Sequence, residues 1–373
     1  MIATFFSAKA AGEPLAGRPG MSLSNPTFKI VDPTRDSTWD EALSALADQT
    51  DRSFFHSALW ARVLKDSYGY TPLYLIASRE QRVCGCLPVV EVDSWLTGRR
   101  GVSLPFTDEC RPLATDPVDG TLLLEKAVEL GRERGWRWFE SQGGGDCLPQ
   151  SNDSSLWYYG HAIDLQKTLA DLFAGFESSV RRAIHKAQRE GVRVERSGNI
   201  EALRAYYSLH CQTRKRHGLP PQPWSFFEHL HQHVIARDLG FVLLARYQGQ
   251  WVGGAVFVHD GDEAIYKYSA SDLAHQNLRP SNLVLWEAIQ WLAQNGFNRL
   301  NLGRTSPGNK GLRQFKQNWG SAEYRVEYLK FGYRQNQFVR GRDDACGWHN
   351  AVFRRLPGFA ARLAGALLYR HWG

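Results

Sequence analysis

The chain has 373 residues, of which 43% are hydrophobic and 22% are charged. This length and apolar content permit two domains of ordinary size, each with its own core. No run of about eighteen apolar residues is present, so no transmembrane helix is expected. The 45 basic and 38 acidic residues give a net charge of +7, which favours an anionic partner. Nucleic acid, a phosphorylated substrate and an anionic membrane all fit that charge.

The N-terminal residues 1–26 are expected to form a disordered extension, because residues 7–26 are rich in Ala, Gly, Ser and Pro. Met21 is an alternative start. The first residues lack the basic flank and long apolar core of a signal peptide, so a cytoplasmic protein is expected. The six cysteines are scattered without a Cys-x-x-Cys pair, so we expect free thiols and no metal site.

Residue patterns predict alternating helices and strands along the whole chain. The first half should contain a strand at 28–31, helices at 39–47 and 57–66, strands at 73–78, 83–92 and 101–104, a helix at 120–134 and a strand at 136–140. The second half should contain a strand at 157–165, helices at 169–173 and 177–190, a strand at 192–196, helices at 200–216 and 224–237, three strands between 241 and 270, a helix at 281–295, a strand at 299–302, a short helix from 311 and a last strand to 331. An α+β fold follows from this order.

Two segments of the first half recur in the second half. Residues 75–90 align with 243–258 as strand, turn and strand, which pairs Ala77 with Ala245 and Gly85 with Gly253. A helix and the strand after it, 122–136, align in the same order with 283–297. Any two hairpins look alike, but two matches in one order favour an internal duplication. A Gly-Gly-Gly run at 143–145, followed by Pro149, Ser151 and Asn152, is interpreted as the linker between the halves.

The helix at 180–189 carries a basic stripe. Val180, Ile184 and Ala187 are spaced as a buried face, and Arg181, Arg182 and Lys186 lie on the opposite face. A solvated surface helix would look the same. The density of cations favours contact with a phosphate of a tRNA, a nucleotide-linked sugar or a lipid-linked precursor.

The segment 213–224 is predicted to be a rigid loop, because it contains a glycine and three prolines just after a helix. Rigid loops often carry sites. Candidate substrate contacts here are Arg214, Arg216, His217 and Trp224. The alternative is a plain connection between two helices.

The most informative stretch is 311–320. Gly311 and Gly320 bracket a short helix. Leu312, Phe315 and Trp319 are expected to share its buried face, so that Arg313 and Lys316 project together from another face.

This stretch resembles the Phe-Lys-x-x-Phe/Trp-Gly signature of the FemAB-like transferases, a branch of the GNAT acyltransferase superfamily. The resemblance extends over 28–333. Its other segments are 214–223, 279–283 and 303–308, and they look like the subgroup associated with bacterial exopolysaccharide and exosortase systems, with a BioF2-like acetyltransferase domain.

The resemblance implies two tandem GNAT-like (acyl-CoA N-acyltransferase) domains, at 27–150 and 151–335, with mixed, largely antiparallel sheets flanked by helices. It also implies an acyl-transfer role for Lys316, and Arg304 at the preceding strand end could stabilise the same oxyanion. The alternative for Lys316 is a surface cation. Further expected substrate contacts are Tyr266, Arg279, Asn282, Arg313 and Phe315. No general base emerges from spacing; Glu287, Glu323 and Tyr266 are candidates.

Residues 275–282, at the start of the predicted helix at 281–295, indicate which acyl donor the chain could bind. GNAT enzymes that use acetyl-CoA resemble one another there in a glycine-containing turn whose amides cradle pyrophosphate. This chain has no glycine there, and Pro280 removes one amide. The departure weakens acyl-CoA as donor and favours aminoacyl-tRNA, with Arg279 still available for a donor phosphate. No tightly bound cofactor is expected.

Residues 336–373 are expected to form a basic amphipathic tail. Phe359, Leu363 and Leu367 share one face of a helix, with arginines around them. A helix within 354–372 could lie on the inner face of the plasma membrane or pack on the protein body.

The leading hypothesis is a FemAB-like enzyme that transfers an aminoacyl or acyl group to an amine of a cell-envelope glycan, exopolysaccharide or lipid-linked precursor. Two alternatives stay open: a CoA-dependent N-acetyltransferase in exopolysaccharide modification, and a non-catalytic, membrane-associated assembly factor. The oligomeric state is left open.

Overall fold

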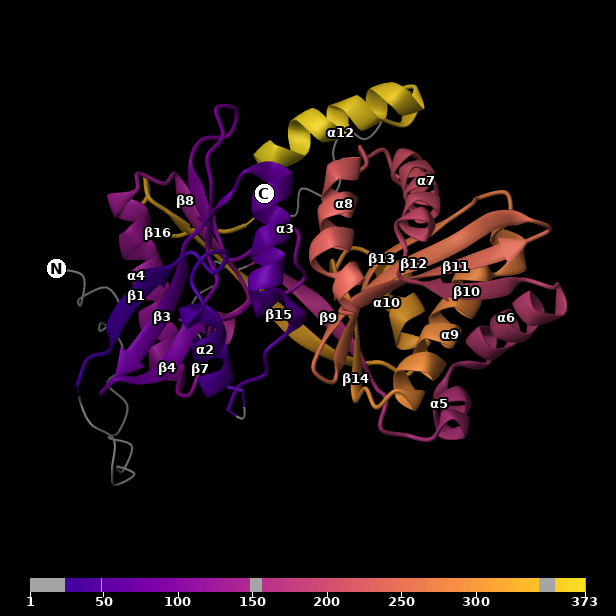
Figure 1. Cartoon of the computed structure of the whole chain (residues 1–373), viewed down its shortest axis with the longest axis horizontal. Helices are drawn as coiled ribbons and strands as arrows, with labels where there is room; N and C mark the ends of the chain where they lie inside the picture. The colour runs from indigo at the N-terminus through magenta and orange to yellow at the C-terminus, as the bar shows by residue number, and fades with distance from the viewer. Residues whose placement is uncertain (1–23, 48, 148–155, 342–352, 373) are drawn as a thin grey trace.

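The computed structural model describes residues 24–47, 49–147, 156–341 and 353–372 (Figure 1). The predicted disordered extension therefore lies outside the described residues as far as residue 23, and so do Pro149, Ser151 and Asn152 of the proposed linker.

The first half contains the following elements. Its strands are β1 (Thr27–Val31), β2 (Thr71–Pro72), β3 (Tyr74–Arg79), β4 (Arg82–Leu87), β5 (Val90–Val92), β6 (Arg100–Val102), β7 (Leu113–Ala114) and β8 (Trp138–Gln142). Its helices are α2 (Thr38–Ala45), α3 (Ala58–Tyr68) and α4 (Pro117–Glu133), with 3-10 turns η1 (Phe54–His56) and η2 (Gly145–Cys147).

The second half is longer. Its strands are β9 (Leu156–Asp164), β10 (Arg193–Ser197), β11 (Gly240–Tyr247), β12 (Gln250–Asp260), β13 (Glu263–Ser271), β14 (Arg299–Thr305), β15 (Ala322–Gly332) and β16 (Gln337–Phe338). Its helices are α5 (Leu169–Gly175), α6 (Ser178–Arg189), α7 (Ile200–Arg216), α8 (Trp224–His233), α9 (Pro280–Gln294), α10 (Lys310–Gln317) and α12 (Gly358–Trp372), with 3-10 turns η3 (Ile235–Arg237) and η4 (Gln276–Leu278).

The predicted duplication is present in the backbone. In the β3–β4 hairpin Ala77 pairs with Gly85, and in the β11–β12 hairpin Ala245 pairs with Gly253, each followed by a register shift after the alanine. Both glycines lie against a crossover helix, because a Cβ on Gly85 would press on α4 and one on Gly253 on Pro280 of α9. Each half also contains one parallel strand pair, β6 with β8 and β13 with β14. The α+β fold with mixed, largely antiparallel sheets is thus confirmed.

The two halves share strands. A long sheet runs in the order β10-β11-β12-β13-β14-β9-β15-β8-β6-β5-β2, and a smaller sheet contains β1, β3, β4 and β7. Strand β9 follows β8 in sequence but pairs with β14, whereas β15 pairs with both β9 and β8. Leu329 and Phe331 of β15 consequently lie in the core of the first half, beside α4. Domain limits at residues 150 and 335 stay a prediction. The sheet passes from one half to the other through strands β9 and β15.

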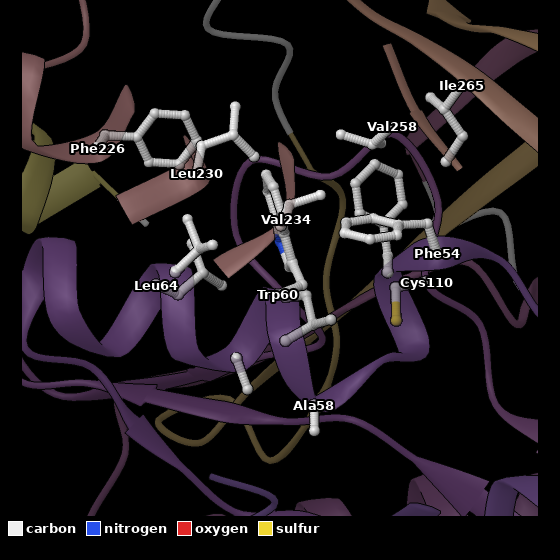
Figure 2. Packing of buried hydrophobic residues seen from close by; sticks show 14 of the residues in the cluster. Phe54, Ala58, Trp60, Leu64, Cys110, Phe226, Leu230, Val234, Val258 and Ile265 are labelled. Carbon is white, nitrogen blue, oxygen red and sulfur yellow. The ribbon is translucent and has the colours of Figure 1, made fainter. Parts of the chain in front are cut away.

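A second connection between the halves is an apolar cluster around α3. Trp60 of α3 is fully buried and makes edge-to-face contacts with Phe54, Phe55 and Phe226 of α8. Figure 2 shows Trp60 between Leu64 on one side and Phe54 and Cys110 on the other, with Leu230 and Val234 above it. Rings packed in this way anchor α3 on α8.

Two local expectations were wrong. Leu312 is exposed, and Lys316 is buried in its place, so α10 turns its lysine inward. Strand β14 continues to Thr305, past the predicted end at residue 302, and remains paired with β9 across an irregularity. The glycine run 143–145, interpreted as part of a linker, is packed against Arg111, Pro112 and Glu327.

Among the described residues, no helix is long and apolar enough to span a bilayer.

Candidate active site

The candidate site lies where β13 and β14 separate. The two strands pair in parallel only from Glu263 to Ile265, opposite 299–301. Each strand then departs from regular pairing with its other neighbour. In β13 the partners of β12 skip from Tyr266 to Tyr268, which leaves Lys267 as the extra residue of a bulge. In β14 the register against β9 shifts between 301 and 304, and Gly303 adopts φ +73°.

A carboxylate from the first half occupies this opening. Asp108, between β6 and β7, accepts a hydrogen bond at Oδ2 from Lys267 Nζ at 3.2 Å and one at Oδ1 from the amide of Arg304 at 3.4 Å. Its carbonyl accepts a hydrogen bond from the Tyr328 hydroxyl at 2.7 Å. A Cβ at position 303 would lie 3.0 Å from Oδ1, so glycine is needed there for its φ angle and for space.

Lys316 lies behind the β14 irregularity. Its Nζ donates to the carbonyls of Gly303 at 2.7 Å and Arg304 at 2.9 Å, and the residue is 5% exposed. The α10 N-cap, Asn309, holds the helix start by accepting from the Leu312 amide. Burial lowers the pKa of Lys316 to about 8, while the negative charge of Asp108 opposes the shift. A surface-cation role for Lys316 does not fit this burial.

Arg304 is fixed by aromatic rings. Its guanidinium lies 4.1 Å from the ring centroid of Tyr158 and 4.8 Å from that of Tyr328. Burial acts to lower the pKa of Arg304, but the two tyrosines and Asp108 outweigh it, so that the pKa is raised and the positive charge is retained.

The opening therefore holds three cations around one carboxylate. Burial acts to raise the pKa of Asp108, but Lys267, Arg304 and Lys316 outweigh burial and keep its pKa below the usual range. Burial lowers the pKa of Lys267, and the negative charge of Asp108 opposes this decrease. The Lys267 ammonium also lies 4.9 Å from the centroid of the Phe55 ring. The net charge of the cluster is positive, which suits a group that becomes an oxyanion.

A cavity of about 1220 Å³ adjoins the cluster. Asp108 and Asn301 belong to both the opening and the cavity wall, which also includes Glu109, Glu263 and Arg299. Burial raises the pKa of Glu263 to about 7, although Arg299 Nε, 3.5 Å from Glu263 Oε1, opposes the shift. Burial likewise raises the pKa of Glu109. The cavity thus contains one carboxyl group, Glu263, with a pKa near neutral pH, and a second, Glu109, whose pKa is shifted in the same direction.

The opposite face of the sheet contains a separate polar group. Arg313 donates from Nε and Nη2 to the two carboxylate oxygens of Glu323, both at 2.7 Å, and stacks on Tyr159. Glu323 Oε2 is also 3.2 Å from Nε2 of buried His161. Burial lowers the pKa of His161, and the nearby charge of Lys316 adds to this effect. Arg313 and Lys316 thus point to different partners instead of projecting together.

The other residues predicted for the site lie in three places: on α6, at the start of α9, and in the apolar core of the second half. Helix α6 presents Arg181, Arg182 and Lys186 away from its buried Val180, Ile184 and Ala187, as predicted, and contacts α9 and η4. Arg279, with φ +60°, precedes α9, and Asn282 is in its first turn. Tyr266 packs on Phe257 and Phe315 on Trp319, within one apolar cluster.

The segment 213–224, predicted to be a loop, is a loop only at 217–223, because α7 continues to Arg216 and α8 begins at Trp224. Its side chains contact the rest of the protein. Arg214 donates to the Tyr369 hydroxyl of α12 at 2.8 Å, and Arg216 donates to the Ser271 carbonyl at 3.4 Å. His217 is the C-cap of α7, and Trp224 packs on Tyr207. Arg214 and Trp224 are thus engaged in packing, whereas Arg216 reaches the end of β13.

Sequence reasoning missed Asp108, Lys267 and Glu263. Lys267 lies between two strand tyrosines, and only the bulge, a tertiary feature, turns it toward Asp108. Asp108 is 159 residues away from Lys267 in sequence. No local pattern connects two such positions. Among the described residues, no group of His, Cys, Asp or Glu side chains is arranged to hold a metal ion.

Replacing Asp108 with Asn should lower the free energy of unfolding at neutral pH, because it leaves the Lys267 ammonium buried without its partner. Loss of one member of a buried pair costs about 3 kcal/mol or more. Lys267→Met should recover most of this loss in the double variant, which a urea-unfolding double-mutant cycle measures.

The pH dependence of the free energy of unfolding is a control for this double-mutant cycle. Because the pKa of Asp108 is lowered, its stabilising contribution is present above the ordinary aspartate value near 3.9 and lost as the pH falls through the folded value. Additive effects at neutral pH, within about 0.5 kcal/mol, would contradict the pairing.

Residues 174–317 match the family model described as an acetyltransferase (GNAT) domain. A search of curated proteins gave no match. The solved structure of FemX is similar over 77% of this chain and 95% of that chain, with a TM-score of 0.61 and 14% identity.

Two further structures show the same fold at low sequence identity. A tandem GNAT protein from the clavulanic acid biosynthesis pathway is similar over 82% of this chain and 98% of that chain, with a TM-score of 0.54 and 12% identity. The C-terminal domain of a protein described as a lysylphosphatidylglycerol synthetase from Agrobacterium fabrum is similar over 84% and 96%, with a TM-score of 0.52 and 13% identity. Residues 174–317 thus match a GNAT acetyltransferase domain, and the chain as a whole shares the fold of a tandem GNAT protein.

Proposed function

We propose that this chain transfers an aminoacyl or acyl group to an amine of a cell-envelope glycan, an exopolysaccharide or a lipid-linked precursor. The observation that carries the proposal is the buried Lys316 ammonium, held by two backbone carbonyls at the opening between β13 and β14. Open sheets commonly bind ligands where neighbouring strands diverge.

The reaction requires a charge to be stabilised at a carbonyl oxygen. An acceptor amine attacks the acyl carbon, a C–N bond forms, and the ester or thioester bond to the donor breaks with departure of its alcohol or thiol. Negative charge develops on the carbonyl oxygen in between. Lys316 and Arg304 supply fixed positive charge for it, and a fixed donor in a water-poor site is worth about 3 to 4 kcal/mol.

The attacking amine must also lose a proton. Glu263 is the proposed acceptor, since it lines the cavity and its pKa is raised by burial to about 7. A carboxylate with this pKa can take up a proton at neutral pH and return it to the departing alcohol or thiol. Glu323 is less suited, because its carboxylate is bound by Arg313 and its pKa is lowered by that hydrogen bond.

Aminoacyl-tRNA is the proposed donor. At the crossover turn Pro280 has no amide, and the amides of Asn282 and Leu283 both donate to the Arg279 carbonyl. This helix start therefore offers few free amides to a pyrophosphate. The basic face of α6, which contacts η4 beside Arg279, suits the phosphates of a larger anionic donor.

The neighbouring structures agree with this class of reaction. One of them is named as a synthetase of lysylphosphatidylglycerol, a name that joins an amino acid to a lipid. An amine acceptor attached to a lipid or glycan is consistent with the size of the cavity, about 1220 Å³.

An acyl-CoA donor is the second candidate. It is favoured by the match of residues 174–317 to an acetyltransferase family model. The acceptor would be the same amine, and Lys316 would keep its role.

Lys316→Ala should lower the transfer rate by about 100- to 1000-fold, because the oxyanion loses its fixed cation. The assay supplies radiolabelled aminoacyl-tRNA or acetyl-CoA and an amine-bearing lipid-linked precursor, and it measures label in the acceptor. Lys310→Ala, on the exposed first residue of the same helix, should leave the rate unchanged. A folded Lys316→Ala protein with full activity in cells and no transfer by the wild type would instead support a non-catalytic assembly factor.

Titration of acetyl-CoA into the purified protein should show no saturable heat, because the α9 start lacks the amides for a pyrophosphate. Isothermal calorimetry at moderate salt is the measurement. Saturable binding with a dissociation constant near a micromolar value, about −8 kcal/mol, would establish the acyl-CoA candidate over aminoacyl-tRNA.

A further inference from the structure

Large apolar side chains gather on one exposed surface around α12. Six of the ten exposed large hydrophobic residues in the described parts of the chain lie on α12 or on the turn at 94–97. Five of them are Phe359, Leu363 and Leu367 of the helix and Trp95 and Leu96 of the turn, and we call these five residues the apolar ridge. The sixth, Trp372, lies on the inner side of the helix and packs on Tyr369. Trp95 is 86% exposed and Phe359 69%. Contiguous exposure of this kind marks an interaction surface.

The ridge is not the face by which α12 packs on the protein. The helix contacts α3 and α7, and Figure 1 shows it along one edge of the molecule, beside the ends of α3, α8 and α7. Its inner residues Ala361, Gly365 and Tyr369 are buried. A Cβ at Gly365 would overlap the Pro221 carbonyl, so the helix backbone is in close contact with the 217–223 loop. Packing on the protein body, one of the two alternatives from the sequence, is thus observed for the inner face, and the membrane alternative concerns the outer face.

The turn and the helix form one fixed unit. The carbonyl of His371 accepts hydrogen bonds from Thr97 Oγ1 at 3.1 Å and from Arg100 Nη2 at 2.8 Å. The His371 ring is 2.9 Å from Ser94 Oγ and packs edge-on against Trp95. These contacts give the His371 carbonyl two donors at the C-terminal end of α12 and hold the 94–97 turn, with Trp95, against the helix. The ridge is therefore preformed.

The charges on α12 and just before it are all positive, and the exposed Asp93 beside the turn is paired with Arg99 at 2.9 Å. Arg355, Arg362 and Arg370 are exposed on α12 or just before it, and no Asp or Glu occurs from residue 353 to the end of the chain. A second copy docked on this face would bring these arginines near their own copies, which is repulsive. An anionic bilayer complements both the arginines and the apolar side chains.

We propose that α12 and the 94–97 turn dock the protein on an anionic membrane surface. Phe359, Leu363 and Leu367 enter the boundary between headgroups and acyl chains, and the flanking arginines contact lipid phosphates. The helix lies in the plane of the interface, since its inner face remains on the protein. This docking is independent of the acyl-transfer chemistry, and it would bring the enzyme to lipid-linked acceptors at the membrane.

The test is sedimentation of the full-length protein with vesicles of phosphatidylcholine, alone or mixed with phosphatidylglycerol. The wild type should bind the mixed vesicles and release them as salt is raised. The double variant Leu363→Glu/Leu367→Glu should bind at least about 100-fold more weakly, because burial of each leucine supplies roughly a tenfold change in affinity.

Two matched variants separate docking from general effects. Val118→Glu/Leu273→Glu adds the same charge at two exposed aliphatic sites, each 61% exposed and outside the ridge, and should bind as the wild type does. Arg362→Gln/Arg370→Gln should weaken binding to the mixed vesicles and reduce its salt dependence. Circular dichroism melts of all variants verify that the fold is retained.

Several results would overturn the proposal. Wild-type protein that does not sediment with mixed vesicles would do so, as would equal binding by the ridge variant and the matched control. Analytical ultracentrifugation of the same samples tests whether a second copy of the chain covers the ridge instead of a membrane. A wild-type dimer that becomes a monomer in the ridge variant would assign the ridge to a second copy.

Discussion

The site depends on the contact between Asp108 and the diverging strands β13 and β14. Parallel strands that stop pairing leave backbone groups without partners, and a buried opening of this kind requires other polar groups. Asp108 supplies one, through the amide of Arg304, and pairs with the Lys267 ammonium that the β13 bulge turns inward. Gly303 permits that approach because it has no Cβ and tolerates φ +73°. The same irregularity directs two carbonyls at Lys316.

The positions of β9 and β15 explain how residues from both halves meet at the opening between β13 and β14. Because β9 pairs with β14 and β15 bridges β9 to β8, the sheet continues from one half to the other without an edge between them. The loop that carries Asp108 is thereby held over the second half, and Tyr328 of β15 fixes its carbonyl. One half contributes the carboxylate and the other contributes the cations. The two halves, which share hairpin and helix elements, thus contribute different groups to the opening.

The sequence predicted much of this arrangement and missed its center. The alignment of the hairpin at 75–90 with that at 243–258 agrees with the structure, where Ala77 pairs with Gly85 and the aligned Ala245 pairs with Gly253. Strand alternation and glycine positions are local signals, so the sequence could show this likeness. Position 316 was recognised through a motif, but its burial was not, because helix periodicity assigns Leu312 to the core. Asp108 and Lys267 had no local signal, as their proximity follows from a bulge and a long-range contact. For α12, the pattern showed an apolar stripe without showing which face packs on the protein.

A measurement of the Lys316 pKa tests the central claim, a buried ammonium poised at the opening between β13 and β14, most directly. Nuclear magnetic resonance of protein labelled at the lysine ε-carbon, with Lys316→Arg to assign the signal, follows that group through a pH titration. The account predicts a value of about 8, well below the ordinary value of 10.5, because burial disfavours the ammonium. A titration near 10.5 would place Lys316 in water and contradict the account.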